Sequence, residues 1–150
     1  MSFIRTDQQA ALNDLLVAIR ETNDHYRDAV ELVNQEAVGN ELLGIARYRE
    51  TFITRLEQAV RESGDLPAVP DPDREAGAML IHHVTALLKD DVVTDVLEQR
   101  LEGEKNLANL IAEGQAVSLE KSHHELLDEI SQHIARTIEQ LQSIHKATAE

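Results

Sequence analysis

An internal repeat is visible in outline in VTDVLEQRLEGEKNLANLI, residues 93–111, which resembles LNDLLVAIRETNDHYRDAV, residues 12–30, at an offset of 81 positions. In both segments apolar residues recur three or four positions apart, the spacing of a helix with one buried face. One pair breaks the likeness at a position predicted to face inward, where Asn23 of the first segment falls on Glu104 of the second. The repeat therefore predicts two related helices with different polar residues in the interior.

Helix signals recur along the whole chain, and no segment requires a strand. Thr6-x-x-Gln9 has the form of a capping box at the start of a first helix, and Val38-Gly39-Asn40 is predicted to end it. All three prolines lie in residues 64–73, which cannot be helical throughout. Helices are predicted at residues 7–36, 41–62, 73–89, 91–113 and 118–146.

The connections between these helices predict how they are arranged. Short turns at 38–40 and 114–117 make two antiparallel helical hairpins. The longer connection carries the short helix at 73–89, which reaches roughly 25 Å at 1.5 Å per residue and can link opposite ends of a bundle. We therefore predict one all-α domain over residues 1–150, a four-helix bundle with one long crossover, which is the ferritin-like topology.

Composition excludes several classes of partner. The chain has 14 basic and 28 acidic residues, a formal charge of −14, which repels nucleic acid and anionic membrane surfaces. Cysteine is absent, so the sequence offers no disulfide, thiol nucleophile or zinc–thiolate site. No signal peptide or membrane-spanning run is recognisable. We expect a cytoplasmic protein without nucleic-acid or membrane partners.

Several short motifs give the chain a family resemblance. They are LNDLL at 12–16, Tyr26 followed by a basic residue, Arg49 three residues before Phe52, and LEQRLEGEKNLA at 97–108. With the proline-bearing crossover, they resemble a bacterial ferritin-like four-helix-bundle family catalogued as a domain of unknown function. The resemblance covers most of the chain. It implies the fold and little chemistry, because that family has no settled activity.

The di-iron centre of many ferritin-like proteins is predicted to be missing. Such a centre uses one Glu from each of two helices and a Glu-x-x-His from each of the other two. The second predicted helix contains no histidine, and Asn23 stands where the repeat has Glu104. The one Glu-x-x-His, from Glu120 to His123, falls in the first turn of the last helix, too near its end for a central site.

A buried polar layer is predicted in place of that centre. Asn23, Arg49, Glu104 and His133 each continue the apolar series of their own helix, so all four should point inward. A buried carboxylate costs several kcal/mol unless it is paired. The preferred interpretation is that Glu104 pairs with Arg49, with Asn23 and His133 completing the hydrogen bonds.

The alternative is a reduced metal site in the same layer. Glu104 and His133 would hold a single iron or manganese ion, helped by Glu98 or Asp24. The adjacent pairs at 82–83 and 123–124 are a weaker metal signal, since neighbouring helical residues diverge by about 100°. We expect those histidines to be solvated or to lie at an interface.

Two functional classes remain open. The preferred hypothesis is a non-catalytic bundle without a cofactor that acts through self-association or a protein partner, and the alternative is a metal-binding or redox protein. No phosphate-binding loop or nucleophilic arrangement supports an enzyme. A symmetric dimer is expected because the crossover carries more apolar side chains than four helices need. These are Val69, Met79, Leu80, Val84, Leu87 and Leu88.

Overall fold

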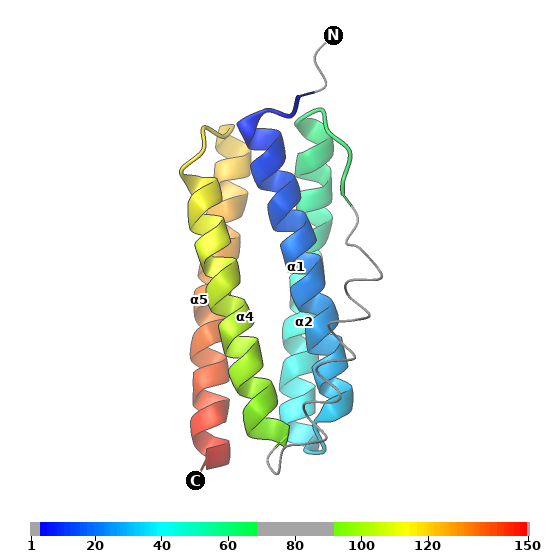
Figure 1. Ribbon diagram of the computed structural model, residues 1–150, viewed down its shortest axis with the longest axis vertical. Helices are drawn as coiled ribbons and strands as arrows, with labels where there is room; N and C mark the ends of the chain where they lie inside the picture. Colours follow the sequence, from blue (N-terminus) through cyan, green and yellow to red (C-terminus); the bar gives the residue numbers. More distant parts are fainter. Residues whose placement is uncertain (1–3, 69–91, 150) are drawn as a thin grey trace.

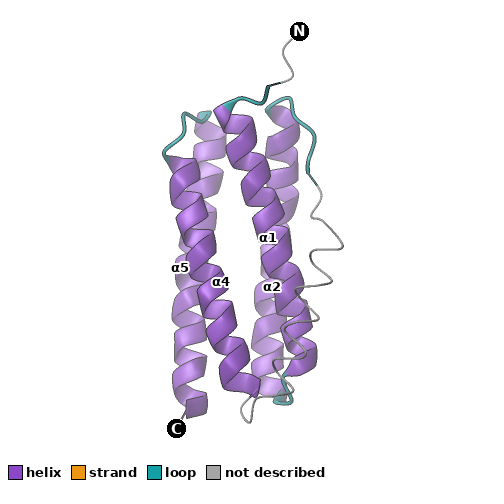
Figure 2. Ribbon diagram, in the orientation of Figure 1, coloured by secondary structure: helices purple, strands orange, loops and turns teal. Residues whose placement is uncertain are grey.

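The computed structural model describes residues 4–68 and 92–149. Within those ranges the chain forms four helices and no strand (Figure 2). They are α1 (Asp7–Leu32), α2 (Glu36–Glu62), α4 (Val92–Gln115) and α5 (Lys121–Ala149). The predicted helix at 73–89 and the six apolar residues predicted for a dimer surface lie outside the described residues, as do His82 and His83. The described chain is therefore an all-α helical bundle.

The helices form two antiparallel hairpins that lie side by side (Figure 1). α1 packs on α2 and α4 packs on α5 within the hairpins, while α1 on α4 and α2 on α5 join them. α2 ends at the end of the bundle where α1 begins, and α4 begins at the opposite end. The chain from Ala68 to Val92 therefore connects opposite ends of the bundle, as predicted for the crossover.

The apolar core is divided along its length into two clusters. One cluster contains Leu16, Leu56 and Ile130, and the other contains Leu97 and Leu141. Burying each such side chain contributes roughly 1.5–3 kcal/mol. Polar residues lie between the two clusters, and their arrangement is described below. Among the described helices, none combines the length and apolar character needed to cross a bilayer.

The start of α1 confirms the predicted capping box. The Gln9 amide N–H donates to Thr6 Oγ1 at 3.1 Å, and the Thr6 N–H donates to Gln9 Oε1 at 2.9 Å. These two bonds satisfy amides that have no partner inside the helix. The position predicted for the chain's first helix is therefore correct at its N-terminal end.

The first turn was predicted too late in the sequence. α1 ends at Leu32, where Val33 takes an extended conformation, and α2 already begins at Glu36. Gly39 lies inside α2 rather than ending α1, and a Cβ atom added there would stand 3.6 Å from a Val33 methyl carbon. Val38 beside it is buried. Val38 and Gly39 thus pack against the turn at residues 33–35 as part of α2, and Gly39 does not end a helix.

The start of α5 also differs from the prediction. α4 continues to Gln115 and α5 begins at Lys121, three residues after the start predicted at residue 118. The Glu120 N–H donates to Gln8 Oε1 of α1 at 2.7 Å. A side chain from another helix thus satisfies this amide, an arrangement that local sequence signals do not report.

Asn13 fixes the path of the chain after α2. Its buried side chain donates to Asp65 Oδ2 at 2.7 Å and to the Leu66 carbonyl at 3.0 Å, and its Oδ1 accepts from the Ala68 N–H at 2.8 Å. Gly64 turns the chain toward Asn13 with a φ of 89°, a conformation that favours glycine. α1 therefore holds the first residues of the crossover.

Candidate functional site

Arg49, Glu104 and His133 meet at the centre of the bundle. Arg49 comes from α2, Glu104 from α4 and His133 from α5, and their exposed fractions are 0%, 1% and 5%. In the sequence, Arg49 separates residues of the two apolar clusters. The three residues therefore form a polar layer across the interior.

The predicted ion pair between Arg49 and Glu104 is present. Arg49 Nη1 donates to Glu104 Oε2 at 3.1 Å, and Arg49 Nη2 donates to Glu104 Oε1. A two-pronged contact of this kind matches the planar guanidinium to both carboxylate oxygens. The carboxylate is thus paired, which offsets the cost of removing it from water.

Tyr26 completes the surroundings of Glu104. Its hydroxyl donates to Glu104 Oε1 at 2.8 Å, and its ring centroid lies 5.1 Å from the guanidinium carbon of Arg49. Burial, followed by the negative charge of Glu104, raises the pKa of Tyr26 well above its usual value. The phenol therefore stays protonated and donates a hydrogen bond to Glu104. Both oxygens of that carboxylate accept hydrogen bonds.

His133 is bound to the same guanidinium. Arg49 Nε donates to His133 Nε2 at 3.2 Å, so this ring nitrogen accepts a hydrogen bond and carries no proton. Burial, then the positive charges of Arg49 and Arg136, lowers the pKa of His133 to about 3. The ring also packs on Tyr48 and Phe52, with centroids 5.1 and 5.2 Å away. His133 is consequently a neutral acceptor at physiological pH.

Asn23 is buried, with an exposed fraction of 5%, but it does not have the role predicted for it. Its amide oxygen has no hydrogen-bond partner in the part of the chain that the structure describes. The hydroxyl of Thr22, the preceding residue, lies 3.4 Å from Arg49 Nη1. The polar bonds of the layer are thus completed by Tyr26 and Thr22, which sequence reasoning had not included.

The other two proposed metal ligands, Glu98 and Asp24, form no hydrogen bond or ion pair with Glu104 or His133 in the described chain. Glu98 is exposed and contacts His145 Nε2 at 3.3 Å, while Asp24 is half-buried on α1. Within residues 4–68 and 92–149, no group of three His, Asp or Glu side chains has an arrangement that could hold a metal ion. The Glu98 carboxylate is exposed and pairs with His145, whereas Glu104 and His133 are buried.

The expectation for the histidine pair at 123–124 is half correct. His124 is exposed and lies 3.7 Å from Asp128. His123 is only 2% exposed, with its ring nitrogens 3.4 Å from Gln8 Oε1 and from Glu62 Oε2. The prediction that His123 is solvated is wrong, because the apolar spacing of α5 directs it inward beneath α1 and α2.

Arg100 is a second buried guanidinium that sequence reasoning missed. It is 4% exposed, and its guanidinium carbon lies 5.6 Å from the ring centroid of Tyr26. Arg100 Nη2 lies 3.3 Å from His25 Nδ1, whereas Nη1 has no hydrogen-bond partner in the described chain. A sequence signal existed, because Arg100 lies between the inward-facing residues Leu97 and Glu104.

Comparison of the chain with family models, with curated proteins and with solved structures gives no match. The ferritin-like resemblance therefore stays a prediction.

Proposed function

We propose that this protein is a ferritin-like bundle in which a buried arginine layer replaces the di-iron centre. It would act without catalysis and without a cofactor, through self-association or a protein partner. One observation carries the proposal: the Arg49 guanidinium donates to both Glu104 and His133, the two ligands that a metal site would need first.

The chemistry of these contacts favours an arginine-filled centre. A metal ion needs free lone pairs on carboxylate and imidazole ligands. Both oxygens of Glu104 and Nε2 of His133 accept hydrogen bonds already, and Arg49 brings its own positive charge between them. A divalent ion would have to displace the guanidinium, which would then stay buried without a partner.

The directions of the helices support the ferritin-like assignment. α2 and α4 run the same way, and the crossover joins opposite ends of the bundle, as in the one-crossover topology. The internal repeat relates α1 to α4, as expected if one hairpin was duplicated. A bundle with up-down-up-down connections would require α4 to begin at the end where α2 stops.

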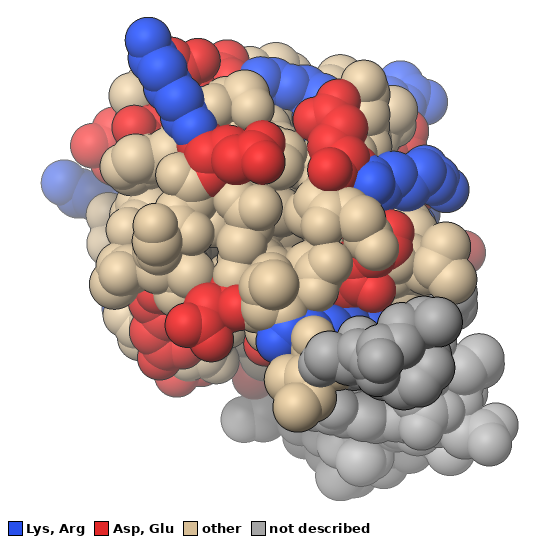
Figure 3. Space-filling view, turned by 90° about the horizontal axis from the view of Figure 1, so that it is seen from above, with Lys and Arg blue, Asp and Glu red and all other residues tan. Residues whose placement is uncertain are grey.

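One end of the bundle offers a surface for association. The end at which α1 begins carries Ile4 and Leu66, which are 85% and 78% exposed, and Arg5 contacts Asp65 beside them at 2.7 Å. On this end the visible acidic and basic side chains are interspersed around an uncharged centre (Figure 3). Exposed apolar side chains with mixed charges around them suit a protein surface better than a polyanion.

Metal analysis tests the first part of the proposal. We expect untagged protein, purified from cells supplied with iron and manganese, to hold far less than one ion per chain. One ion of either metal per chain would overturn the proposal if it were lost in Glu104→Gln and His133→Gln. For that outcome to count, the metal ion should still be bound by the Glu50→Gln variant, which changes an exposed carboxylate as a control.

Sedimentation across micromolar concentrations tests the association. We expect a dimer that Leu66→Asp weakens, because the new charge would have to be desolvated at the interface. Ala147→Asp adds the same charge at the other end of the bundle and should leave the dimer intact. Equal sedimentation of all three proteins as monomers would remove the case for self-association through this end.

A further inference from the structure

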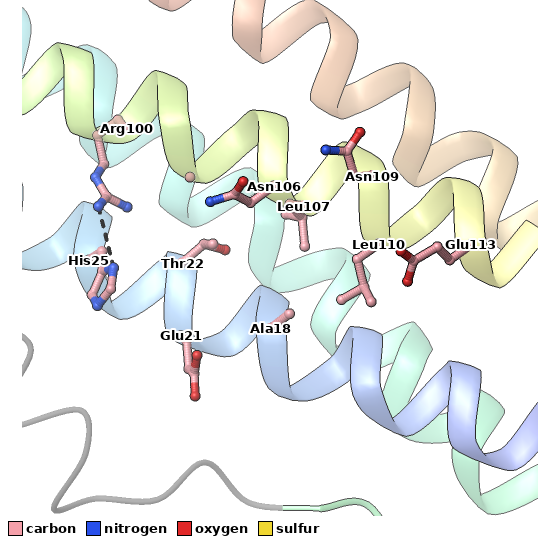
Figure 4. Close-up of a pocket in the computed structure, with 11 residues that line it drawn as sticks. Ala18, Glu21, Thr22, His25, Arg100, Asn106, Leu107, Asn109, Leu110 and Glu113 are labelled. Carbon is pink, nitrogen blue, oxygen red and sulfur yellow. Dashed lines mark hydrogen bonds between the residues drawn. The ribbon is translucent and has the colours of Figure 1, made fainter.

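A groove runs between α1 and α4 beside the polar layer, with a volume of about 490 Å³ (Figure 4). Clefts that bind small molecules typically enclose about 300–1,000 Å³. At one end of this groove Arg100 and His25 contact each other across it, and farther along lie Ala18, Leu107 and Leu110, with Glu113 beyond Leu110. The groove therefore has the size of a small-molecule site and places a cationic group next to an apolar stretch.

Arg100 at the polar end is the strongest sign of a ligand. Buried charges are normally paired, as Arg49 is with Glu104. Arg100 instead contacts the imidazole of His25 and the ring of Tyr26, and its Nη1 has no hydrogen-bond partner in the described residues. Burial, with the charge of Arg49, lowers the pKa of Arg100, and attraction to Tyr26, Glu104 and Asp28 opposes this, although none of these three forms a hydrogen bond with Nη1. A ligand that accepts a hydrogen bond and carries negative charge would supply what this guanidinium lacks.

Gly103 lies beside the Arg100 guanidinium, where a larger residue would restrict the access of a ligand. A Cβ atom at Gly103 would stand 3.6 Å from Arg100 Nη1, so a side chain at position 103 would lie against the guanidinium, and glycine has none there. Nη1 itself is covered, and the guanidinium must turn slightly toward Gly103 to face the groove. No side chain at position 103 opposes that turn.

We propose that the groove binds a small aliphatic carboxylate, with its carboxylate on Arg100 and its hydrocarbon chain along Ala18, Leu107 and Leu110. A carboxylate matches the guanidinium in charge and in geometry. Along α4, the rise from Arg100 to Leu107 and Leu110 is roughly 10–15 Å, which suits a chain of about eight carbons. This site does not depend on the function proposed above.

Titration calorimetry with octanoate tests the proposal on the full chain. We expect one octanoate per chain, bound about ten-fold or more weakly by Arg100→Met, which removes the charged donor. Gly103→Leu should weaken binding similarly by filling the groove, and leucine favours a helix over glycine, so this variant should stay folded. Arg27→Met removes an exposed guanidinium that is paired with Glu50, and it should bind octanoate as the parent protein does.

Octan-1-ol has the same eight-carbon chain as octanoate but a hydroxyl in place of the carboxylate. It should bind at least about ten-fold more weakly than octanoate. The proposal would be overturned by the absence of octanoate binding at millimolar concentration. Equal affinity in Arg100→Met, or equal binding of octan-1-ol, would overturn it as well, because the guanidinium would then play no part.

Discussion

Replacing Arg49 by methionine should cost this bundle much of its stability. The substitution keeps an extended apolar side chain but removes two hydrogen bonds to Glu104 and one to His133. Glu104 would stay buried, with the hydroxyl of Tyr26 as its remaining donor among the described side chains. Breaking a buried ion pair on one side typically costs about 3–5 kcal/mol. Urea unfolding at neutral pH should show a loss of that size.

A double-mutant cycle separates the ion pair from the packing around it. Glu104→Leu alone should also cost about 3–5 kcal/mol, since it strands Arg49. The double variant removes both charges and leaves the Tyr26 hydroxyl and His133 Nε2 unpaired, at roughly 1–3 kcal/mol for each group, and each of these losses also occurs in one of the single variants and so cancels in the cycle. The coupling energy between positions 49 and 104 should therefore reach at least about 3 kcal/mol. Adding Tyr26→Phe should recover part of the remaining loss.

The surface pair of Arg27 and Glu50 provides the matched control. Its side chains are 45% and 51% exposed, so the same two substitutions should give a coupling of about 0–1 kcal/mol. A coupling for Arg49 and Glu104 as small as that of the control would refute the reasoning. It would mean that water or neighbouring groups compensate Glu104, and that Arg49 is not the cation on which the layer depends.

Two further predictions concern His133 and Asn13. The pKa of His133 is about 3 in the folded protein and ~6.5 in an unfolded chain, so between these pH values only the unfolded chain binds the proton. The free energy of unfolding should consequently fall with falling pH by at most about 1.4 kcal/mol per unit from this residue, and His133→Gln should remove that part of the slope in urea titrations from pH 7 to 4. Asn13→Leu breaks three hydrogen bonds to residues 65–68 and should cost roughly 2–3 kcal/mol by the same assay, whereas exposed Asn106→Leu should change stability by less than about 0.5 kcal/mol. A loss below that of the Asn106 control would show that α1 does not hold this segment.

The polar layer could be predicted in outline because helical periodicity carries that information. Arg49, Glu104 and His133 each occupy a position where the surrounding sequence demands an apolar residue. The physics of buried charge then requires that an acid on one helix find a base on another. Since Arg49 is a base in the interior, its pairing with Glu104 was the preferred interpretation of the sequence, beside a metal site.

The remaining contacts depend on depth and rotation, which periodicity does not give. Tyr26 reads as an ordinary core aromatic, and only the height of α1 relative to α4 brings its hydroxyl to Glu104. Asn23 faces inward as predicted, but its amide oxygen forms no hydrogen bond with the other described residues of the layer. The turn at 33–35 was missed for a similar reason, because glycine is both a common helix terminator and a residue that permits close packing.

The difference between the two copies of the repeat has an electrostatic consequence. If α1 carried a carboxylate where Asn23 stands, the layer would hold two acids, that one and Glu104, and the single charge of Arg49 could neutralise only one of them. A second buried acid is stable only when another cation is present, and a metal ion fills that role in a di-iron protein. With an amide at position 23 and an arginine at 49, the Arg49–Glu104 pair is neutral without an ion. The amide at position 23 and the arginine at position 49 therefore act together, because either a carboxylate at 23 or the loss of Arg49 would leave a buried carboxylate without a guanidinium bonded to it.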